Sequence, residues 1–346
     1  MVSCSHRDGS RSALVRRSRS SSRRPARHQP PRPQGTRRVV HEWVLVAGPD
    51  AARNRIDRQH VSPPDQRRAS HARADGVLIE MISQDRLRIL ARELGVRQGY
   101  AEKNYVNSWL LWGIFTSDCG DNLLFKGGTA LSKLYFPQSW RFSEDLDFGV
   151  EGECQGSKQE LRTVLDTIAD RSGIDFEIRE HHESQQDHYP THYVDISIQY
   201  RAVLNHPNTT SINVMVDEHV AFDPVQHTHA YEEPEFDLQA YSVEEIFAEK
   251  LRAIYQRGAA RDYYDLYQLL ETDSVTINFA DVGPAFDAKC KHDGLTVDLN
   301  EGLPAEQQET IRHQWETTLP DLTGDPPAFK MVWEQLNMAI SRQGSS

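Results

Sequence analysis

The spacing of apolar residues changes near residue 80. In 1–80, arginine, serine and proline dominate, and apolar residues are too few and too scattered to offset the entropy of ordering the chain. We therefore expect 1–80 to be a disordered basic extension. From Met81 onward apolar residues recur at helix and strand periods, which predicts an α/β domain over 81–235 and a helical domain over 236–340.

Two segments of the α/β part have the apolar spacing of amphipathic helices. The first covers about 101–116 and is marked by Tyr105, Trp109, Trp112 and Ile114. The second is marked by Leu161, Val164, Leu165 and Ile168.

Short apolar runs and alternating patterns predict strands. These strands are expected at 122–126, 145–150, 193–200 and 211–216. Gly127-Gly128 is the expected turn between the first strand and a short helix over 129–135. The pattern becomes helical after Ser242, so we expect an α/β (α+β) fold in which a small mixed sheet precedes a helical C-terminal region. The active site is expected in the cleft between them.

The net charge of −12 hides an uneven distribution. Residues 1–80 contain 17 arginines, no lysine and seven acidic residues, a net charge of +10, which leaves −22 for the rest of the chain. A protein region with so negative a net charge ordinarily repels the phosphate backbone of a nucleic acid. Two interpretations of 1–80 stay open: upstream sequence translated ahead of a true start at Met81, or a basic arm that grips nucleic acid.

Cysteine and histidine spacing indicates neither a disulfide framework nor a zinc site. The four cysteines are scattered without a paired motif, which fits a reducing cytoplasm. The chain has no apolar run long enough to span a bilayer, and no apolar stretch follows Arg16-Arg17 to make a signal sequence, so we expect no membrane partner. We interpret the histidine-rich stretch as a solvated loop; its members are His181, His182, His188 and His192.

Asp145 and Asp147 form the first candidate catalytic feature. The alternation of a strand places both carboxylates on one face and Leu146 and Phe148 on the other. Paired carboxylates repel each other unless a cation neutralises them, and Mg²⁺ takes one or two carboxylates together with substrate phosphate oxygens. The alternative is a chance DxD in an acidic chain.

An upstream turn strengthens the metal interpretation. Between a strand and a helix start, Lys126-Gly127-Gly128-Thr129 exposes backbone N–H groups that can cradle phosphate. Such a turn, followed within about twenty residues by a carboxylate-bearing strand, combines a triphosphate site with a metal site. An ordinary strand-to-helix turn is the alternative.

Lys250 lies on the apolar stripe of a helix that Ser242 and Glu245 open as a capping box. A lysine among apolar neighbours must snorkel, pair with an acid or meet a bound anion. Gly258 suits the end of that helix, and Asp262 begins the next, with Asp265 on the same face. Asp262 fits a helix-capping role as well as a catalytic one, and we expect Asp265 to orient Arg261 or a cap.

The stretches FKGGTALSKLYFPQSWRFSEDLDF and VEEIFAEKLRAIYQRGAARDYYDLYQLL together resemble the four signatures of the AbiEii/AbiGii nucleotidyltransferase toxins, the group that includes the MenT toxins of type IV toxin–antitoxin systems. The resemblance covers about 95–340. It implies a polymerase-β-like core, a bound NTP with Mg²⁺ or Mn²⁺, a nucleotide-contacting Lys250 and an active-centre Asp262. We also expect Lys133 and Arg261 to contact the phosphates.

The wider polymerase-β-like superfamily often carries a third carboxylate on a later strand. Here Met215 occupies the position where an acid is expected, and Asp217, on the same face as Asn213 and Met215, is a weak candidate for the third metal ligand.

The resemblance implies transfer of a nucleotide to an RNA acceptor, with a tRNA 3′ end the leading expectation. The effect would be growth arrest in an abortive-infection or toxin–antitoxin system, held in check by a cognate antitoxin. Two alternatives stay open: a kinase-like or protein-nucleotidylating enzyme with the same site, and a catalytically inactive binding protein.

Overall fold

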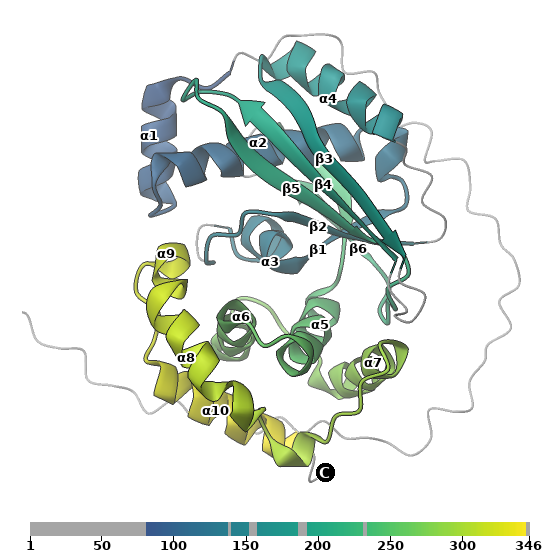
Figure 1. The fold of residues 1–346 in the computed structure, drawn as a ribbon, viewed down its shortest axis with the longest axis vertical. Helices are drawn as coiled ribbons and strands as arrows, with labels where there is room; N and C mark the ends of the chain where they lie inside the picture. The colour runs from purple at the N-terminus through teal and green to yellow at the C-terminus, as the bar shows by residue number, and fades with distance from the viewer. Residues whose placement is uncertain (1–80, 138–139, 152–157, 186–191, 231–233, 344–346) are drawn as a thin grey trace, which may run out of the picture. The chain divides into compact units, whose positions relative to one another are not determined.

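A mixed β-sheet is the framework of the part of the chain that the structure describes (Figure 1). Its strands are β1 (Leu123–Lys126), β2 (Leu146–Val150), β3 (Asp175–Gln185), β4 (His192–Arg201), β5 (Asn208–Met215), β6 (Val225–His229) and β7 (Phe236–Ala240). They lie in the order β3-β4-β5-β2-β1-β7-β6. The pairs β2–β5 and β1–β7 are parallel and the others are antiparallel.

The structure is a computed structural model, which describes residues 81–343 except 138–139, 152–157, 186–191 and 231–233. The expected basic extension over 1–80 lies outside the described residues. Within them, one hydrophobic cluster includes residues of the sheet and of the C-terminal helices.

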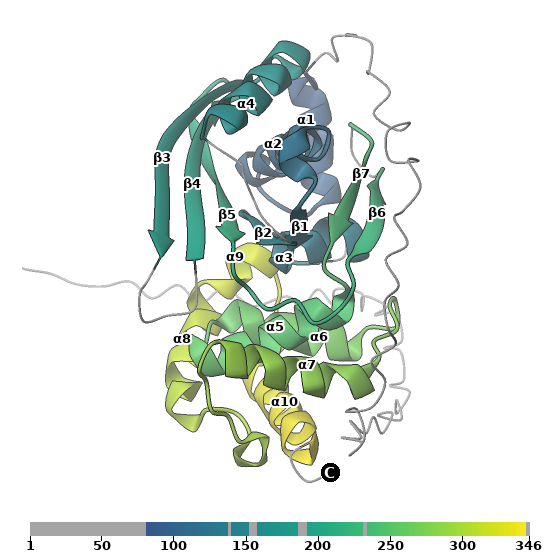
Figure 2. The same cartoon turned by 90° about the vertical axis from the view of Figure 1, so that its right-hand side faces the viewer.

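Helices precede, interrupt and follow the sheet. The first group comprises α1 (Gln84–Glu93), α2 (Gln98–Phe115), the short turn η2 (Asp118–Gly120), α3 (Gly127–Ala130), which continues as the π-helical turn η3 (Leu131–Tyr135), and α4 (Lys158–Ser172). The second group comprises α5 (Val243–Gln256), α6 (Ala260–Glu271), α7 (Phe279–His292), η4 (Leu299–Glu301), η5 (Ala305–Gln307), α8 (Gln308–Thr317), α9 (Leu319–Thr323) and α10 (Phe329–Gln343). Figures 1 and 2 show α2 and α4 on one face of the sheet, with α5 to α10 beyond one end of the strands.

The predicted fold class is confirmed: a mixed sheet precedes a group of helices. The sheet continues through β7 to Ala240, beyond the expected boundary at residue 235, and the helices begin at Val243. Among the described residues, no helix is long and apolar enough to cross a membrane.

Two local predictions need correction. The helix predicted at 101–116 is α2, but it is buried along most of its length rather than on one face, because α1, α4 and the sheet pack around it. The histidine-rich stretch is not a loop in its described part, since His181 and His182 belong to β3 and His192 begins β4. β3 carries mostly polar residues, so the alternation that marks a half-buried strand is weak in its sequence.

Candidate active site

The middle of the sheet brings three polar side chains together on one face. Asp147 on β2 is in register with Lys126 on β1 and with Asn213 on β5, and residues paired across strands share a face. The side chains of Leu146 and Phe148 are buried in the core. Asn213 donates its amide N–H to Asp147 Oδ1 over 3.0 Å, which fixes the orientation of the carboxylate.

The turn after β1 fits closely around this carboxylate. Gly127 has a φ of +77°, a conformation that favours glycine, and a Cβ placed there would lie 2.6 Å from Asp147 Oδ2. Thr129 donates its hydroxyl to the Asp145 backbone oxygen at 2.5 Å. The turn therefore holds the segment bearing both aspartates and leaves room for Asp147.

The carboxylate of Asp147 lies close enough to Asp145 for its charge to affect the ionisation of Asp145. Burial, followed by the negative charge of Asp147, raises the pKa of the Asp145 carboxyl above its usual range, and the nearby Arg261 guanidinium partly offsets this. A partly buried carboxylate beside a second negative charge favours a cation next to it.

A second cluster surrounds Lys250 on α5. Its ammonium group lies 2.8 Å from Asp262 Oδ1 and 3.1 Å from Asp265 Oδ2, both on α6. Burial opposes the charge, yet these two carboxylates raise the pKa of Lys250. Asp262 also accepts from Arg257 over 3.0 and 3.1 Å, and Asp265 accepts a bidentate pair from the buried Arg141 over 2.6 and 2.7 Å.

This cluster corrects one prediction and resolves two local alternatives. Asp265 binds Arg141 and Lys250 rather than orienting Arg261 or a cap. Asp262 directs its carboxylate to Lys250 and Arg257 rather than to the helix end, and Lys250 is ion-paired rather than snorkelling. Gly258 ends α5 with a φ of +55°, as predicted.

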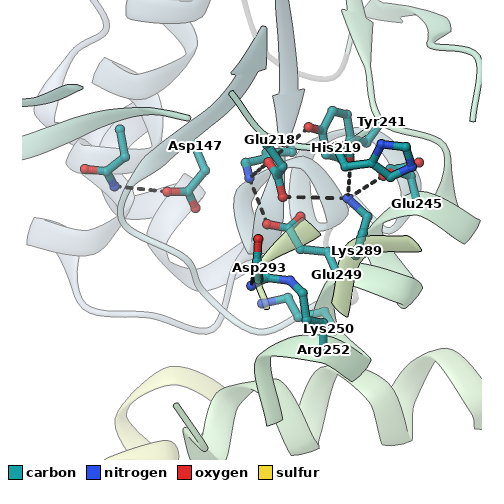
Figure 3. A network of polar contacts seen from close by, with 12 residues as sticks. Asp147, Glu218, His219, Tyr241, Glu245, Glu249, Lys250, Arg252, Lys289 and Asp293 are labelled. Atoms are coloured by element: carbon teal, nitrogen blue, oxygen red, sulfur yellow. Dashed lines mark hydrogen bonds and ion pairs between the residues drawn. The ribbon is translucent and has the colours of Figure 1, made fainter. Parts of the chain in front are cut away.

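A third cluster links β1, α5 and α7 (Figure 3). Lys126 donates to Glu218 and, over 2.8 Å, to Glu249 Oε1. Lys289 on α7 lies 2.5 Å from Glu245 Oε1 and 3.6 Å from Glu218 Oε1, and donates to the His219 backbone oxygen. Burial opposes ionisation of Glu249, but Lys126 and then Lys289 lower its pKa to about 2.

The three clusters meet at one cavity of about 280 Å³. Of the predicted site residues it is lined by Lys126, Gly127, Gly128, Asp145, Asp147, Lys250 and Arg261. Its lining therefore combines the paired carboxylates with seven lysine and arginine side chains, and Lys126 lies beside Asp147 on the same face of the sheet.

Four predicted site residues lie outside this lining. Thr129 donates a hydrogen bond to the Asp145 backbone oxygen, and Asp262 is fully buried, where it accepts a hydrogen bond from Lys250. The Lys133 ammonium donates to Asn104 O and Ser108 Oγ on α2. Asp217 is exposed at the end of β5, where it accepts from the His192 backbone N–H over 2.6 Å.

Several lining residues were not predicted from the sequence, namely Asn213, Glu218, Glu249, Arg252, Arg257 and Lys289. Arg257 lies seven residues after Lys250, on the same helix face, so helical spacing could have identified it. Lys289 lies among the buried Ala285, Phe286 and Cys290. A lysine among apolar neighbours on a helix is the same pattern that drew attention to Lys250. Glu218 follows β5 in a loop, where no local pattern indicates its partners.

The oxygen-bearing side chains at this site suit a divalent cation that is held by only a few protein ligands. No group of three or more His, Cys, Asp or Glu side chains suited to a metal occurs among the described residues. Asp145 and Asp147 can supply two carboxylates, and the position next to Asp147 on β5 is the amide Asn213 rather than a third acid. Mg²⁺ commonly binds through one or two carboxylates with substrate phosphates completing the shell.

Paired carboxylates on a mixed sheet line this cavity beside a glycine turn and several basic side chains, and with the family match below they make the chain a nucleotidyltransferase. More narrowly, the chain belongs to the AbiEii nucleotidyltransferase toxin family of type IV toxin–antitoxin systems, whose family model, described as "Nucleotidyl transferase AbiEii toxin, Type IV TA system", matches residues 109–336. The predicted family is thereby confirmed.

A solved structure supports the same fold. The chain is similar to MenT4, a nucleotidyltransferase toxin from Mycobacterium tuberculosis, with a TM-score of 0.55 and 20% sequence identity over 75% of this chain and 90% of that one. At this identity the likeness shows the fold alone. No curated protein sequence matches the chain.

Proposed function

We propose that this toxin transfers a nucleotidyl group from an NTP to a hydroxyl of an RNA acceptor, with a tRNA 3′ end the favoured acceptor. The observation that carries the proposal is the cavity that Asp145 and Asp147 line together with Lys126, Lys250 and Arg257. The carboxylates suit a cation, and the ammonium and guanidinium groups suit a polyphosphate, as the transfer requires.

The cations of the cavity bind and orient the triphosphate. An ammonium group has three donors, and Lys126 and Lys250 each direct donors to two carboxylates. A remaining donor of each lysine is then available to a phosphate oxygen. Arg257 and Arg261 are both exposed, so their side chains can complete the phosphate contacts while the core residues keep their positions.

Asp145 and Asp147 would hold a Mg²⁺ or Mn²⁺ ion, which would neutralise phosphate charge and polarise the α-phosphorus. Asn213 and the Gly127 turn fix the Asp147 carboxylate, so the ligand geometry is set before the nucleotide enters.

Labelled nucleotides test the proposal. The full chain is incubated with total RNA, Mg²⁺ and each NTP in turn, labelled at either the α or the γ phosphate. We expect label in RNA from one or more α-labelled NTPs and none from the γ-labelled forms, with release of pyrophosphate. Transfer of γ label would identify a kinase-like enzyme, and label in protein alone would identify a protein-nucleotidylating one.

Growth provides the second test. Expression of the wild-type chain should arrest a bacterial host, and a cognate antitoxin should relieve the arrest. A chain that neither arrests growth nor turns over any NTP would be the inactive binding protein of the alternative interpretation.

A further inference from the structure

A second cavity of about 440 Å³ lies against the carboxylate end of the first. The two cavities share Arg141, Ser143, Asp145 and Arg261 in their linings. The second is an open cavity that is otherwise lined by residues of α8, of α9 and of the segments preceding β2 and α6. Asp145 therefore lies between the two cavities, accessible from each.

The first lining carries seven lysines and arginines against five acidic residues, whereas the second carries two against two. The first cavity contains five cations that the second lacks: Lys126, Lys250, Arg252, Arg257 and Lys289. The second has only the shared Arg141 and Arg261, and Arg141 is buried in its bidentate pair with Asp265. A triphosphate is consequently drawn to the first cavity, and the second suits a ligand part with little charge.

The chemistry of the second lining fits a nucleoside. Ala259 and Leu322, both half-buried, offer apolar surface for a base or ribose ring beside the buried Ala260 and Leu319. Gln314 accepts the Ala260 backbone N–H through Oε1 over 2.9 Å, which orients its amide N–H₂ as a donor, and Thr318 adds an exposed hydroxyl. A volume of 440 Å³ falls in the usual range of about 300–1,000 Å³ for small-molecule sites.

We propose that the second cavity binds the terminal nucleoside of the acceptor strand and presents its ribose hydroxyl to the α-phosphorus beside Asp145. The inference rests on the proposed nucleotidyl transfer. In that step the hydroxyl oxygen forms a bond to the α-phosphorus, and the bond from the α-phosphorus to the pyrophosphate oxygen breaks. Pyrophosphate leaves with the electron pair, and the hydroxyl proton passes to water.

Two neighbouring threonines at the end of α8 allow a matched test. Thr318 lines the second cavity and Thr317 does not, although both are exposed. Thr318→Trp fills the cavity, whereas Thr317→Trp places the same bulk in solvent. Thr318→Leu gives a smaller obstruction, and its melting temperature and that of both Trp variants report whether the fold is kept.

The probe is total tRNA with the NTP that the wild-type chain incorporates. We expect Thr318→Trp to raise the apparent KM for tRNA by about 10-fold or more, and Thr318→Leu by less, while the KM for NTP changes by no more than about 2-fold. Thr317→Trp should match the wild type in both constants.

The outcomes separate this inference from the proposed function. A Thr318→Trp variant that raises the KM for NTP instead would assign the second cavity to the NTP base and overturn the inference. Equal effects of both Trp variants, or none in a folded Thr318→Trp and Thr318→Leu, would also overturn it. If the wild-type chain labels no RNA, the proposed function itself fails, and the inference fails with it.

Discussion

At the scale of the residue, several cations that line the first cavity are paired with acidic residues. Lys126 contacts Glu218 and Glu249, Lys250 contacts Asp262 and Asp265, and Arg252 contacts Asp293. Such pairing keeps a buried lysine charged despite its desolvation, because the nearby carboxylates favour the ammonium form. The cations are thus positioned before a phosphate arrives, which limits the reorganisation that binding requires.

Asp147→Ala should abolish transfer and leave the fold intact. The change removes a proposed metal ligand, so turnover should fall by more than about 100-fold. The free energy of unfolding should change by no more than about 1 kcal/mol, because the hydrogen bond from Asn213 disappears while repulsion with Asp145 is relieved. Labelled-NTP transfer, Mg²⁺ titration and urea unfolding measure these effects. Toxicity equal to that of the wild type would refute the assignment.

Lys250→Met keeps the length and packing of the side chain and removes its charge. We expect transfer and NTP affinity to be abolished, since the ammonium rather than the stem contacts phosphate. Because the change deprives Asp262 and Asp265 of a buried partner, the free energy of unfolding should also fall by roughly 3 kcal/mol. NTP binding is therefore measured well below the melting temperature of the variant, with Lys250→Ala alongside. A folded Lys250→Met variant with full activity would make Lys250 a structural residue only.

Part of the cavity lining could be predicted residue by residue. A lysine on an apolar stripe drew attention to Lys250, whose expected role came from the family resemblance, and alternation along a strand put Asp145 and Asp147 on one face; all three line the cavity. The Arg141–Asp265 pair joins residues 124 positions apart, and only the fold brings them together. Asp217 lies outside the cavity lining because β5 ends at Met215, and its carboxylate accepts a hydrogen bond from the His192 backbone N–H instead.

At the scale of the element, the turn from β1 into α3 lies against Asp147 and restricts the position of its carboxylate. Its left-handed Gly127 and its close approach to Asp147 leave no space for a side chain. Sequence pattern predicted this unit because a short apolar run, two glycines and a helix start are local signals. β3 was missed because its 11 residues are mostly polar, and β6 and β7 were missed because strands of five residues give a weak periodic signal.

Gly127→Ala should cost both stability and activity, whereas Gly294→Ala should cost stability alone. Both glycines have a positive φ, +77° and +68°, so either substitution strains the backbone by about 1–2 kcal/mol. A Cβ at Gly127 would displace Asp147, but a Cβ at Gly294 would meet nothing within 4 Å. Urea unfolding and the transfer assay on the two variants separate the contributions. Equal activity in both would show that the turn does not position Asp147 for transfer.

At the scale of the whole molecule, buried ion pairs tie the sheet to the C-terminal helices. Lys126 on β1 bonds to Glu249 on α5, and Lys289 on α7 reaches Glu245 on α5 and Glu218 after β5 (Figure 3). These contacts join elements distant in sequence, so breaking them should loosen the association of the two regions around the cavity.

Glu249→Gln should show the contribution of these ion pairs as a change in the pH dependence of the free energy of unfolding. The Glu249 pKa is lowered from its ordinary 4.5 to about 2, so its ionised form stabilises the fold fully above about pH 4.5. That stabilisation disappears as the pH falls toward 2. The difference in free energy of unfolding between wild type and Glu249→Gln should therefore narrow by roughly 2 kcal/mol between about pH 5 and about pH 3. Urea unfolding across this range tests it, and parallel pH profiles would contradict it.

Deletion of 1–80 should leave folding and catalysis intact. The described hydrophobic core and every proposed site residue lie after Met81, and the removed segment is rich in arginine and poor in apolar residues. The deletion changes the net charge from −12 to −22. We expect a cooperative melting transition and full transfer activity in the truncated chain.

The salt dependence of acceptor binding then decides between the two interpretations of 1–80. If 1–80 is a basic arm, the slope of log affinity against log salt should become shallower by about 0.7–0.9 for every phosphate that the arm neutralises. If 1–80 does not touch RNA, affinity and slope should match those of the full chain at every salt concentration. A truncated chain that aggregates or melts without cooperativity would contradict both interpretations, because residues before Met81 would then belong to the fold. An acidic body of charge −22 repels RNA on its own, so a slope that persists after deletion must come from the cations of the site itself.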